Sequence, residues 1–203
     1  MDKFLLVRKQ IENKKQNLYD RIFIVFVILL ISFLYFVTQF WVSISVVQMN
    51  SMANTLMPND KLITDRLATP KRGDIIVFKY DENADYIKRV IAVENQTVYN
   101  DKFGDVFVEY LDKNGKKVVE KLNEDYIKGG SPTYKNMSDF YIDEQNSLFR
   151  VEVKKGELFV MGDNRLVSID SRDFGCISIE QVNGVVHDFW VNNKEIIGKI
   201  FKD

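Results

Sequence analysis

The feature that most constrains this chain is an apolar run near its N-terminus. In residues 22–37, which read IFIVFVILLISFLYFV, the only break is Ser32, and further apolar residues extend the run to Val42. A helix from Ile22 to Val42 would be roughly 31 Å long, close to the ~30 Å thickness of the hydrocarbon core of a bilayer. The sequence therefore predicts a single transmembrane helix over residues 21–42.

The residues around this run predict its orientation in a cell membrane. Tyr35 and Trp41 lie near its far end, where aromatic side chains favour the membrane interface. Basic residues precede the run: Lys3, Arg8, Lys9, Lys14, Lys15 and Arg21. Because positive charge is retained on the cytoplasmic side, we expect residues 1–20 to form a cytoplasmic tail. Everything after residue 42 is then expected outside the cytoplasm.

Two other interpretations of the apolar run remain open. It could be a cleaved signal peptide with residues 43–45, Ser-Ile-Ser, as the small-x-small site. Its apolar core would then be longer than the usual 7–15 residues. It could also be a buried helix of a soluble protein, but a helix that is apolar on every face needs a much larger protein around it.

About 160 residues follow the predicted span, enough for one core, or one core with a smaller appended domain. The charge is nearly balanced, with 28 Lys+Arg against 29 Asp+Glu, and 46% of the residues are hydrophobic. This composition predicts an ordered domain and does not suit a nucleic-acid binder. The single cysteine, Cys176, cannot form an internal disulfide.

Short β-branched segments predict a mainly β, antiparallel domain. Strands are expected at residues 42–46, 75–78, 86–93, 106–111, 117–122, 148–153, 157–161 and 185–191, and the spacing of Ser178 and Gln181 is that of a capping box. Residues 95–155 are more polar and contain the hairpin signal Asn114-Gly115. We therefore expect a β-rich insertion at 95–155, between the two parts of a catalytic core at 43–94 and 156–203.

Two residues in these strands suggest a nucleophile and its base. The strand at 42–46 is expected to carry the chain up to Ser51, at the strand end. In the strand at 86–93, alternation predicts that Lys88 shares a face with Tyr86, Val90 and Ala92. A serine hydroxyl needs a base, and a lysine serves only when neutral, which is true of about one in 2,500 at pH 7 for an ordinary pKa near 10.4. Burial among apolar neighbours is expected to lower that pKa.

Four stretches in this order resemble the motifs of the type I signal peptidases, membrane-tethered serine proteases with a Ser-Lys dyad. Residues 51–56, SMANTL, resemble the nucleophile motif S-M-x-P-T-L, and residues 72–78, RGDIIVF, match the R-G-D strand. Residues 88–92, KRVIA, match the segment that bears the lysine. The most specific match is GDNRLVSIDSR at 162–172, which fits G-D-N-x-x-x-S-x-D-S-R. The resemblance covers most of residues 20–190, and it implies the family's antiparallel β-sheet catalytic domain behind one transmembrane helix.

The resemblance also implies roles for individual residues. Ser51 would attack the scissile carbonyl and Lys88 would act as its general base, with Ser168 orienting the lysine amine. The supporting pairs would be Asp163 with Arg89 and Asp170 with Arg172, and the residues expected to line small, apolar substrate pockets are Val47, Met52, Leu56, Tyr86 and Ile87. The implied substrates are exported preproteins, cut after a small-x-small sequence at the lipid bilayer. No metal, organic cofactor or nucleic acid is implied.

This sequence departs from the family pattern at three places. Asn54 replaces the usual proline, and Glu94-Asn95-Gln96 replaces a P-G-D turn. Met49 stands where relatives have glycine or a serine that assists the oxyanion hole, so the hole would depend chiefly on backbone N–H groups, particularly that of Ser51. These changes suggest a member specialised for a restricted set of exported proteins.

Two other functions follow from the same residues. One is a catalytically weak scaffold or chaperone on the same fold, working with secretion or pilus-assembly machinery. The other is a self-cleaving transcriptional repressor, which also uses a Ser-Lys dyad. The repressor would need a DNA-binding domain where this chain has its apolar run.

Overall fold

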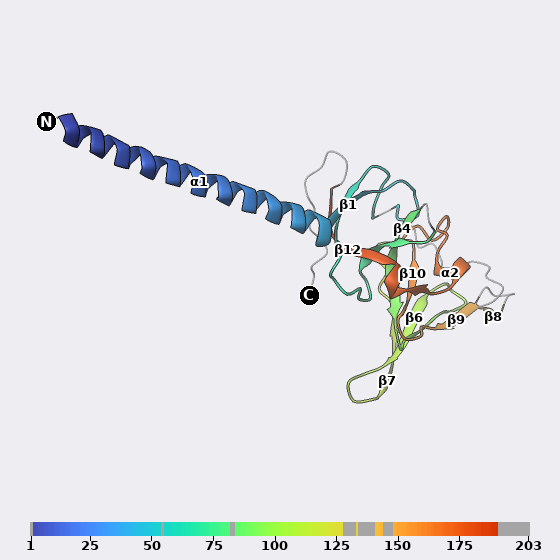
Figure 1. Ribbon diagram of the computed structural model, residues 1–203. Helices are drawn as coiled ribbons and strands as arrows, with labels where there is room; N and C mark the ends of the chain where they lie inside the picture. The colour runs from blue at the N-terminus through green and yellow to red at the C-terminus, as the bar shows by residue number, and fades with distance from the viewer. Residues whose placement is uncertain are drawn as a thin grey trace. The chain divides into compact units, whose positions relative to one another are not determined.

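The computed structural model describes residues 2–53, 55–81, 84–127, 133, 141–143 and 148–190, and the chain divides into two units, residues 1–42 and 43–203. The first unit is one helix, α1 (Asp2–Phe40), shown in blue in Figure 1. Residues 7–37 are long and apolar enough to cross a membrane, and their most apolar part is not buried by protein. The helix is longer than the predicted span at its N-terminal end and shorter at its C-terminal end, since Val42 already belongs to a strand.

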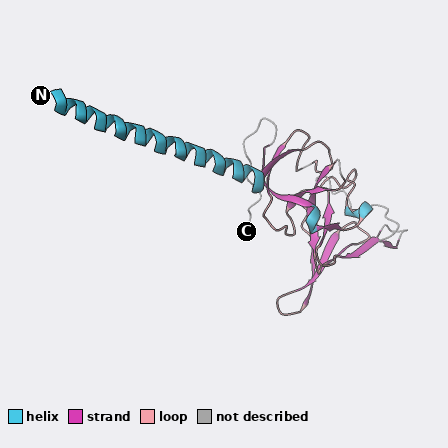
Figure 2. Ribbon diagram, in the orientation of Figure 1, coloured by secondary structure: helices cyan, strands magenta, loops and turns pink. Residues whose placement is uncertain are grey.

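The second unit is mainly β, which confirms the predicted fold class (Figure 2). Its larger sheet has seven strands. Their order is β1 (Val42–Val46), β2 (Lys61–Asp65), β12 (Val182–Trp190), β3 (Ile75–Lys79), β4 (Asp85–Val93), β10 (Glu157–Met161) and β11 (Ile177–Ser178). The pairings from β2 to β11 are antiparallel. The segment that carries Lys88 therefore lies near the centre of the sheet, between β3 and β10.

The apolar run at 75–78 forms the central strand β3, as its composition predicts. All four of its apolar residues are buried: Ile75, Ile76, Val77 and Phe78. Ile75 and Val77 pack in a cluster with Val47 and Met52, whereas Ile76 and Phe78 pack in another with Val90, Val160 and Val185. A strand with an apolar cluster on each face is held in register on both sides, because a slip of one residue would exchange the two faces.

The smaller sheet has five strands, all drawn from residues 97–152. Their order is β7 (Lys117–Lys121), β6 (Val106–Leu111), β5 (Thr97–Asn100), β9 (Leu148–Glu152) and β8 (Tyr141–Asp143). β6 and β7 form the hairpin expected around Asn114-Gly115. This sheet shares one hydrophobic cluster with the larger sheet, in which Phe149 stacks on Phe159 of β10.

The structure corrects the predicted alternation in β4. Val90 and Ala92 of β4 pair with consecutive residues of β10, Val160 and Phe159, so the register shifts at Ile91. Such a bulge moves the following side chains to the opposite face. Ala92 packs in the cluster that contains Phe159, while Val90 packs in the cluster that contains Val160. Ala92 therefore does not share a face with Lys88 and Val90, contrary to the prediction.

The described part of the second unit also contains two short helical segments. α2 (Ser171–Phe174) begins after Asp170, whose side chain forms a capping box with Asp173. η1 (Ile179–Gln181) is a single turn, capped by Ser178 and Gln181 as their spacing predicts.

Candidate functional site

Ser51 lies in a turn that follows β1. The prediction that Ser51 sits at a strand end is wrong, because β1 ends at Val46 and the chain then leaves the sheet. The turn is closed by backbone hydrogen bonds, including Ala53 N–H to the Asn50 carbonyl and Leu56 N–H to the Met52 carbonyl. Met52 and Leu56 are buried and anchor the turn on the apolar core. Ser51 itself is only partly buried and lines two pockets, so a substrate can reach it.

The amine of Lys88 lies beside the hydroxyl of Ser51. Lys88 Nζ is 2.8 Å from Ser51 Oγ and 3.1 Å from the carbonyl oxygen of Ile87. The Lys88 side chain is almost completely buried, with 1% of its surface exposed, and Nζ stands 5.1 Å from the centre of the Tyr86 ring. A neutral amine at this distance is close enough to accept the serine proton.

Gly162 brings the loop after β10 against Ser51. A Cβ atom at this position would lie 2.4 Å from the Ser51 carbonyl oxygen and 2.2 Å from Ser168 Oγ, so only glycine fits without a shift. The neighbouring Asn164 donates its backbone N–H to the same Ser51 carbonyl at 3.0 Å, and its side-chain amide donates to the carbonyl of Asn50 at 3.1 Å. Ser168 is fully buried next to Gly162. Its predicted hydrogen bond to the lysine amine stays a prediction.

Asp163 and Arg89 form a two-point ion pair behind the site. The Asp163 carboxylate accepts hydrogen bonds from Arg89 Nε at 2.9 Å and Nη2 at 2.7 Å, and a third from the Thr55 hydroxyl. Arg89 also donates to the Gly73 carbonyl at 2.8 Å. Burial lowers the pKa of the Arg89 guanidinium, but the hydrogen bonds and charge of Asp163 outweigh it and hold that pKa above its ordinary value. Arg89 therefore remains a fixed positive charge.

Asp170 and Arg172 form a second ion pair, with both side chains buried. Arg172 donates from Nε and Nη2 to the two carboxylate oxygens of Asp170, each at 2.9 Å. Gly162 N–H donates to the same carboxylate, also at 2.9 Å. Burial raises the pKa of Asp170, yet the hydrogen bonds and charge of Arg172, with the Gly162 N–H and Ser168, hold it below its ordinary value. The pair thus fixes both ends of the loop from Gly162 to Arg172.

Sequence reasoning missed a third set of contacts around Arg165. Arg165 is buried, donates to the Gly162 carbonyl at 3.0 Å, and pairs with Glu124 and the Thr133 hydroxyl. Tyr126 stacks with Arg89, whose guanidinium carbon is 4.1 Å from the ring centre. Arg165 lies inside the motif at 162–172, so its position in the sequence was a reason to consider it part of the site. Glu124 and Tyr126 lie in a polar segment without periodicity, and no sequence pattern predicts their contacts.

The single cysteine contributes no nucleophile to this site. Cys176 is half-buried against the cluster that contains Phe149 and Phe159. Burial, aided by the charge of Glu157, raises the pKa of the Cys176 thiol to about 12, so it is protonated at neutral pH.

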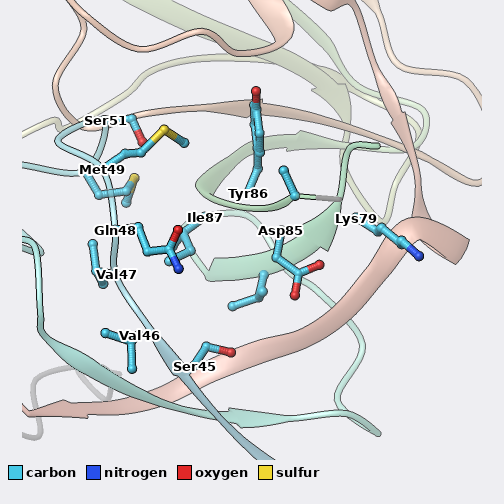
Figure 3. A pocket seen from close by; sticks show the side chains of 13 residues that line it. Ser45, Val46, Val47, Gln48, Met49, Ser51, Lys79, Asp85, Tyr86 and Ile87 are labelled. Carbon is cyan, nitrogen blue, oxygen red and sulfur yellow. The ribbon is translucent and has the colours of Figure 1, made fainter. Parts of the chain in front are cut away.

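A pocket of about 640 Å³ opens beside Ser51 (Figure 3). The chain from Ser45 to Met49 forms one wall, and Lys79 with residues 85–87 forms the other. Four of the five predicted pocket residues line it: Val47, Met52, Tyr86 and Ile87. Leu56 does not; it is completely buried in the core cluster of Val47 and Met52. The sequence pattern alone could not predict whether an apolar residue such as Leu56 lies in the core or in a pocket.

Met49 lines both this pocket and a second one of about 550 Å³, which Ser51 and Lys88 also line. About half of the Met49 side chain is exposed. A thioether is only a weak acceptor and donates no hydrogen bond, so Met49 offers no side-chain donor for a developing oxyanion. Asn54, the other departure in this stretch, lies outside the described residues.

The comparisons with known proteins place this chain in one class, the signal peptidases. A family model described as signal peptidase, peptidase S26, matches residues 19–191. A signal peptidase I of Bacillus caldolyticus is 36% identical over 148 residues, covering 70% of this chain and 75% of that protein. Signal peptidase I P of Bacillus subtilis subsp. natto is 32% identical over 180 residues, covering 86% of this chain and 89% of that protein.

A solved structure of a signal peptidase I from Enterococcus faecalis is also similar, at 27% identity and a TM-score of 0.42, covering 58% of this chain and 97% of that one. The chain belongs to the signal peptidase family, peptidase S26. It is a protease of the signal peptidase I type, the class of peptidase that removes signal peptides from preproteins. The family resemblance of the sequence motifs is thereby confirmed.

Proposed function

We propose that this protein is a membrane-anchored serine endopeptidase in which Ser51 is the nucleophile and Lys88 its general base. The observation that carries the proposal is the 2.8 Å distance between Lys88 Nζ and Ser51 Oγ. The hydroxyl proton passes to the amine as Ser51 Oγ bonds to the scissile carbonyl carbon. The resulting ammonium then gives this proton to the leaving nitrogen as the peptide bond breaks, and water releases the acyl group in the same way.

This mechanism requires a neutral lysine, and two effects on Lys88 oppose each other. Burial favours the neutral amine, because the charged form loses its hydration, and only 1% of the Lys88 side chain is exposed. The Tyr86 ring, whose centre lies 5.1 Å from Nζ, favours the ammonium. The proposal requires that burial outweighs this contact, which the pH dependence of cleavage tests.

The substrate is proposed to be an exported preprotein cut after a small-x-small sequence. The apolar side chains that line the first pocket include Val47, Met52 and Ile87. The backbone N–H of Ser51 is the proposed donor to the oxyanion. Since the loss of one such donor costs ~10² to 10³ in rate, Met49 in place of a hydrogen-bonding residue favours a slower or more selective enzyme.

The proposed anchor is α1, with its N-terminus in the cytoplasm and the catalytic unit outside. The basic residues before the apolar run favour this orientation. Fusion of a reporter that is active only in the cytoplasm should give signal at the N-terminus and none at the C-terminus. The opposite pattern would contradict the orientation while leaving the catalytic proposal untouched.

A comparison of the exported proteins of two variant strains tests the proposed function and identifies the substrates in the same experiment. A strain with Ser51→Ala should accumulate the uncleaved precursors of a defined set of proteins, each with a small-x-small site. A strain with Ser178→Ala, which removes a capping hydroxyl in β11, should process them normally. Normal processing in the Ser51→Ala strain would show that the protein acts without this chemistry, as a scaffold does.

A further inference from the structure

The second pocket beside Ser51 has an apolar wall, and the preference for small residues before the cut bond does not account for it. Five of the described residues that line it are apolar: Met49, Ala53, Met57, Val167 and Ile169. Lys88 is the only charged residue among those lining residues. A pocket with this composition, next to the nucleophile, is suited to an apolar side chain of a substrate.

Val167 and Ile169 reach this pocket because the loop alternates around Ser168. Ser168 is fully buried, whereas 59% of Val167 and 54% of Ile169 remain exposed. It is unfavourable to leave two nearby β-branched side chains in water, and a bound apolar group would cover them. The surrounding loop is rigid, since Asp170 and Arg165 hold it through buried ion pairs.

Lys88 shows which part of the substrate occupies this pocket. Among the described residues, Lys88 lines the second pocket and is not one of those that line the first. In the mechanism proposed above, the Lys88 ammonium returns its proton to the leaving nitrogen, which belongs to the residue directly after the cut bond. That residue must therefore lie on the Lys88 side of Ser51, in the second pocket.

We propose that Val167 and Ile169 make this peptidase select preproteins with an apolar residue immediately after the cleaved bond. The inference rests on the proposed function and adds a preference for the first residue of the mature protein. An acidic residue there is doubly unfavourable: it loses hydration against the apolar wall, and its charge stabilises the Lys88 ammonium, the form that cannot act as a base.

The test compares two preproteins that differ only in the first residue after the cut, leucine against the nearly isosteric asparagine. The full chain in detergent should show a kcat/KM for the leucine substrate about tenfold higher. A Val167→Thr/Ile169→Thr variant, which keeps both side chains β-branched but gives each a hydroxyl group, should reduce this preference to less than about threefold. Leu166→Asn is the matched control, because Leu166 is exposed on the same loop and is not among the residues that line the pocket, so the preference should stay tenfold.

Three outcomes would overturn the inference, and they are distinguishable. If neither substrate is cleaved in a Ser51-dependent way, the proposed function fails and the inference with it. If cleavage depends on Ser51 but the preference is absent, or unchanged in the double variant, the inference alone fails. If the double variant slows both substrates equally in lipid vesicles with the preference intact, Val167 and Ile169 contact lipid instead of substrate.

Discussion

The ion pair between Arg89 and Asp163 joins the two segments that meet at the site. Arg89 directly follows Lys88 in β4, and Asp163 directly follows Gly162, whose loop contacts the Ser51 carbonyl. Asp163 is completely buried, and the Arg89 side chain is 14% exposed. The pair therefore helps to set the distance between Lys88 and Ser51 by joining the segments that follow Lys88 and contact Ser51.

Asp163→Asn should weaken this pair and cost both stability and activity. Removing the charge of one partner of a buried ion pair leaves the other uncompensated, at a cost of roughly 3–5 kcal/mol. We expect a lower Tm of the detergent-solubilised protein and slower preprotein cleavage. Glu152→Gln, at an exposed position in β9, should change neither, and a Tm for Asp163→Asn equal to that of the control would contradict this account.

Gly162→Ala should strongly reduce cleavage, because Gly162 lies against the turn that bears Ser51. The reduction should exceed that of a Gly→Ala change at a position where only the backbone conformation is strained. The new methyl group would meet the Ser51 carbonyl at 2.4 Å, so the turn that bears the nucleophile must shift. Misplacement by about 1 Å can cost ~10² in rate. Gly115→Ala in the β6–β7 hairpin is the matched control: it is strained by its positive φ of 74° but meets nothing within 4 Å, and should leave kcat near wild type. Equal activities in the two variants would argue against the close approach.

The pKa of Asp170 predicts a loss of stability in acid. Because this pKa is lower in the folded protein than its ordinary value of 3.8, the carboxylate contributes stability at neutral pH. That contribution should disappear as the pH falls from about 4 through the folded pKa. In denaturant titrations between pH 7 and pH 2.5, Asp170→Asn should be less stable at pH 7 and show a shallower acid decline. A decline as steep as that of wild type would assign the acid sensitivity to other carboxylates.

The rate of cleavage should rise with pH as Lys88 loses its proton. Below the pKa of the amine, kcat/KM should increase about tenfold per pH unit and then level off. Lys61→Ala, which removes an exposed lysine of β2, should keep the same profile. A flat profile from mildly acidic to alkaline pH, with chemistry limiting the rate, would rule out Lys88 as the base.

Much of this architecture could be predicted from the sequence, because local patterns determine it. The continuous apolar run of β3 and the capping box at Ser178 each formed where expected. The two ion pairs were implied by the family resemblance and not by a local pattern, and Asp163 with Arg89 and Asp170 with Arg172 are indeed in contact.

The errors arose where pairing between distant segments decides the outcome. The bulge at Ile91 depends on how β4 pairs with β10, so alternation within β4 could not predict that Ala92 turns to the other face. Leu56 was assigned to the substrate pocket but is enclosed by the core. The contact between Glu124 and Arg165 joins residues 41 positions apart, and a polar segment without periodicity gave no sign of it.

Cleavage of one purified preprotein by four forms of the full chain tests the central claim most directly. With substrate limiting and a small-x-small site, wild type and Lys61→Ala should release the signal peptide at the same rate. Ser51→Ala and Lys88→Ala should each cleave at least about 10³-fold more slowly, while their Tm stays that of a folded protein. Cleavage by either folded variant at a rate close to wild type would show that Ser51 and Lys88 are not the nucleophile and base of this enzyme.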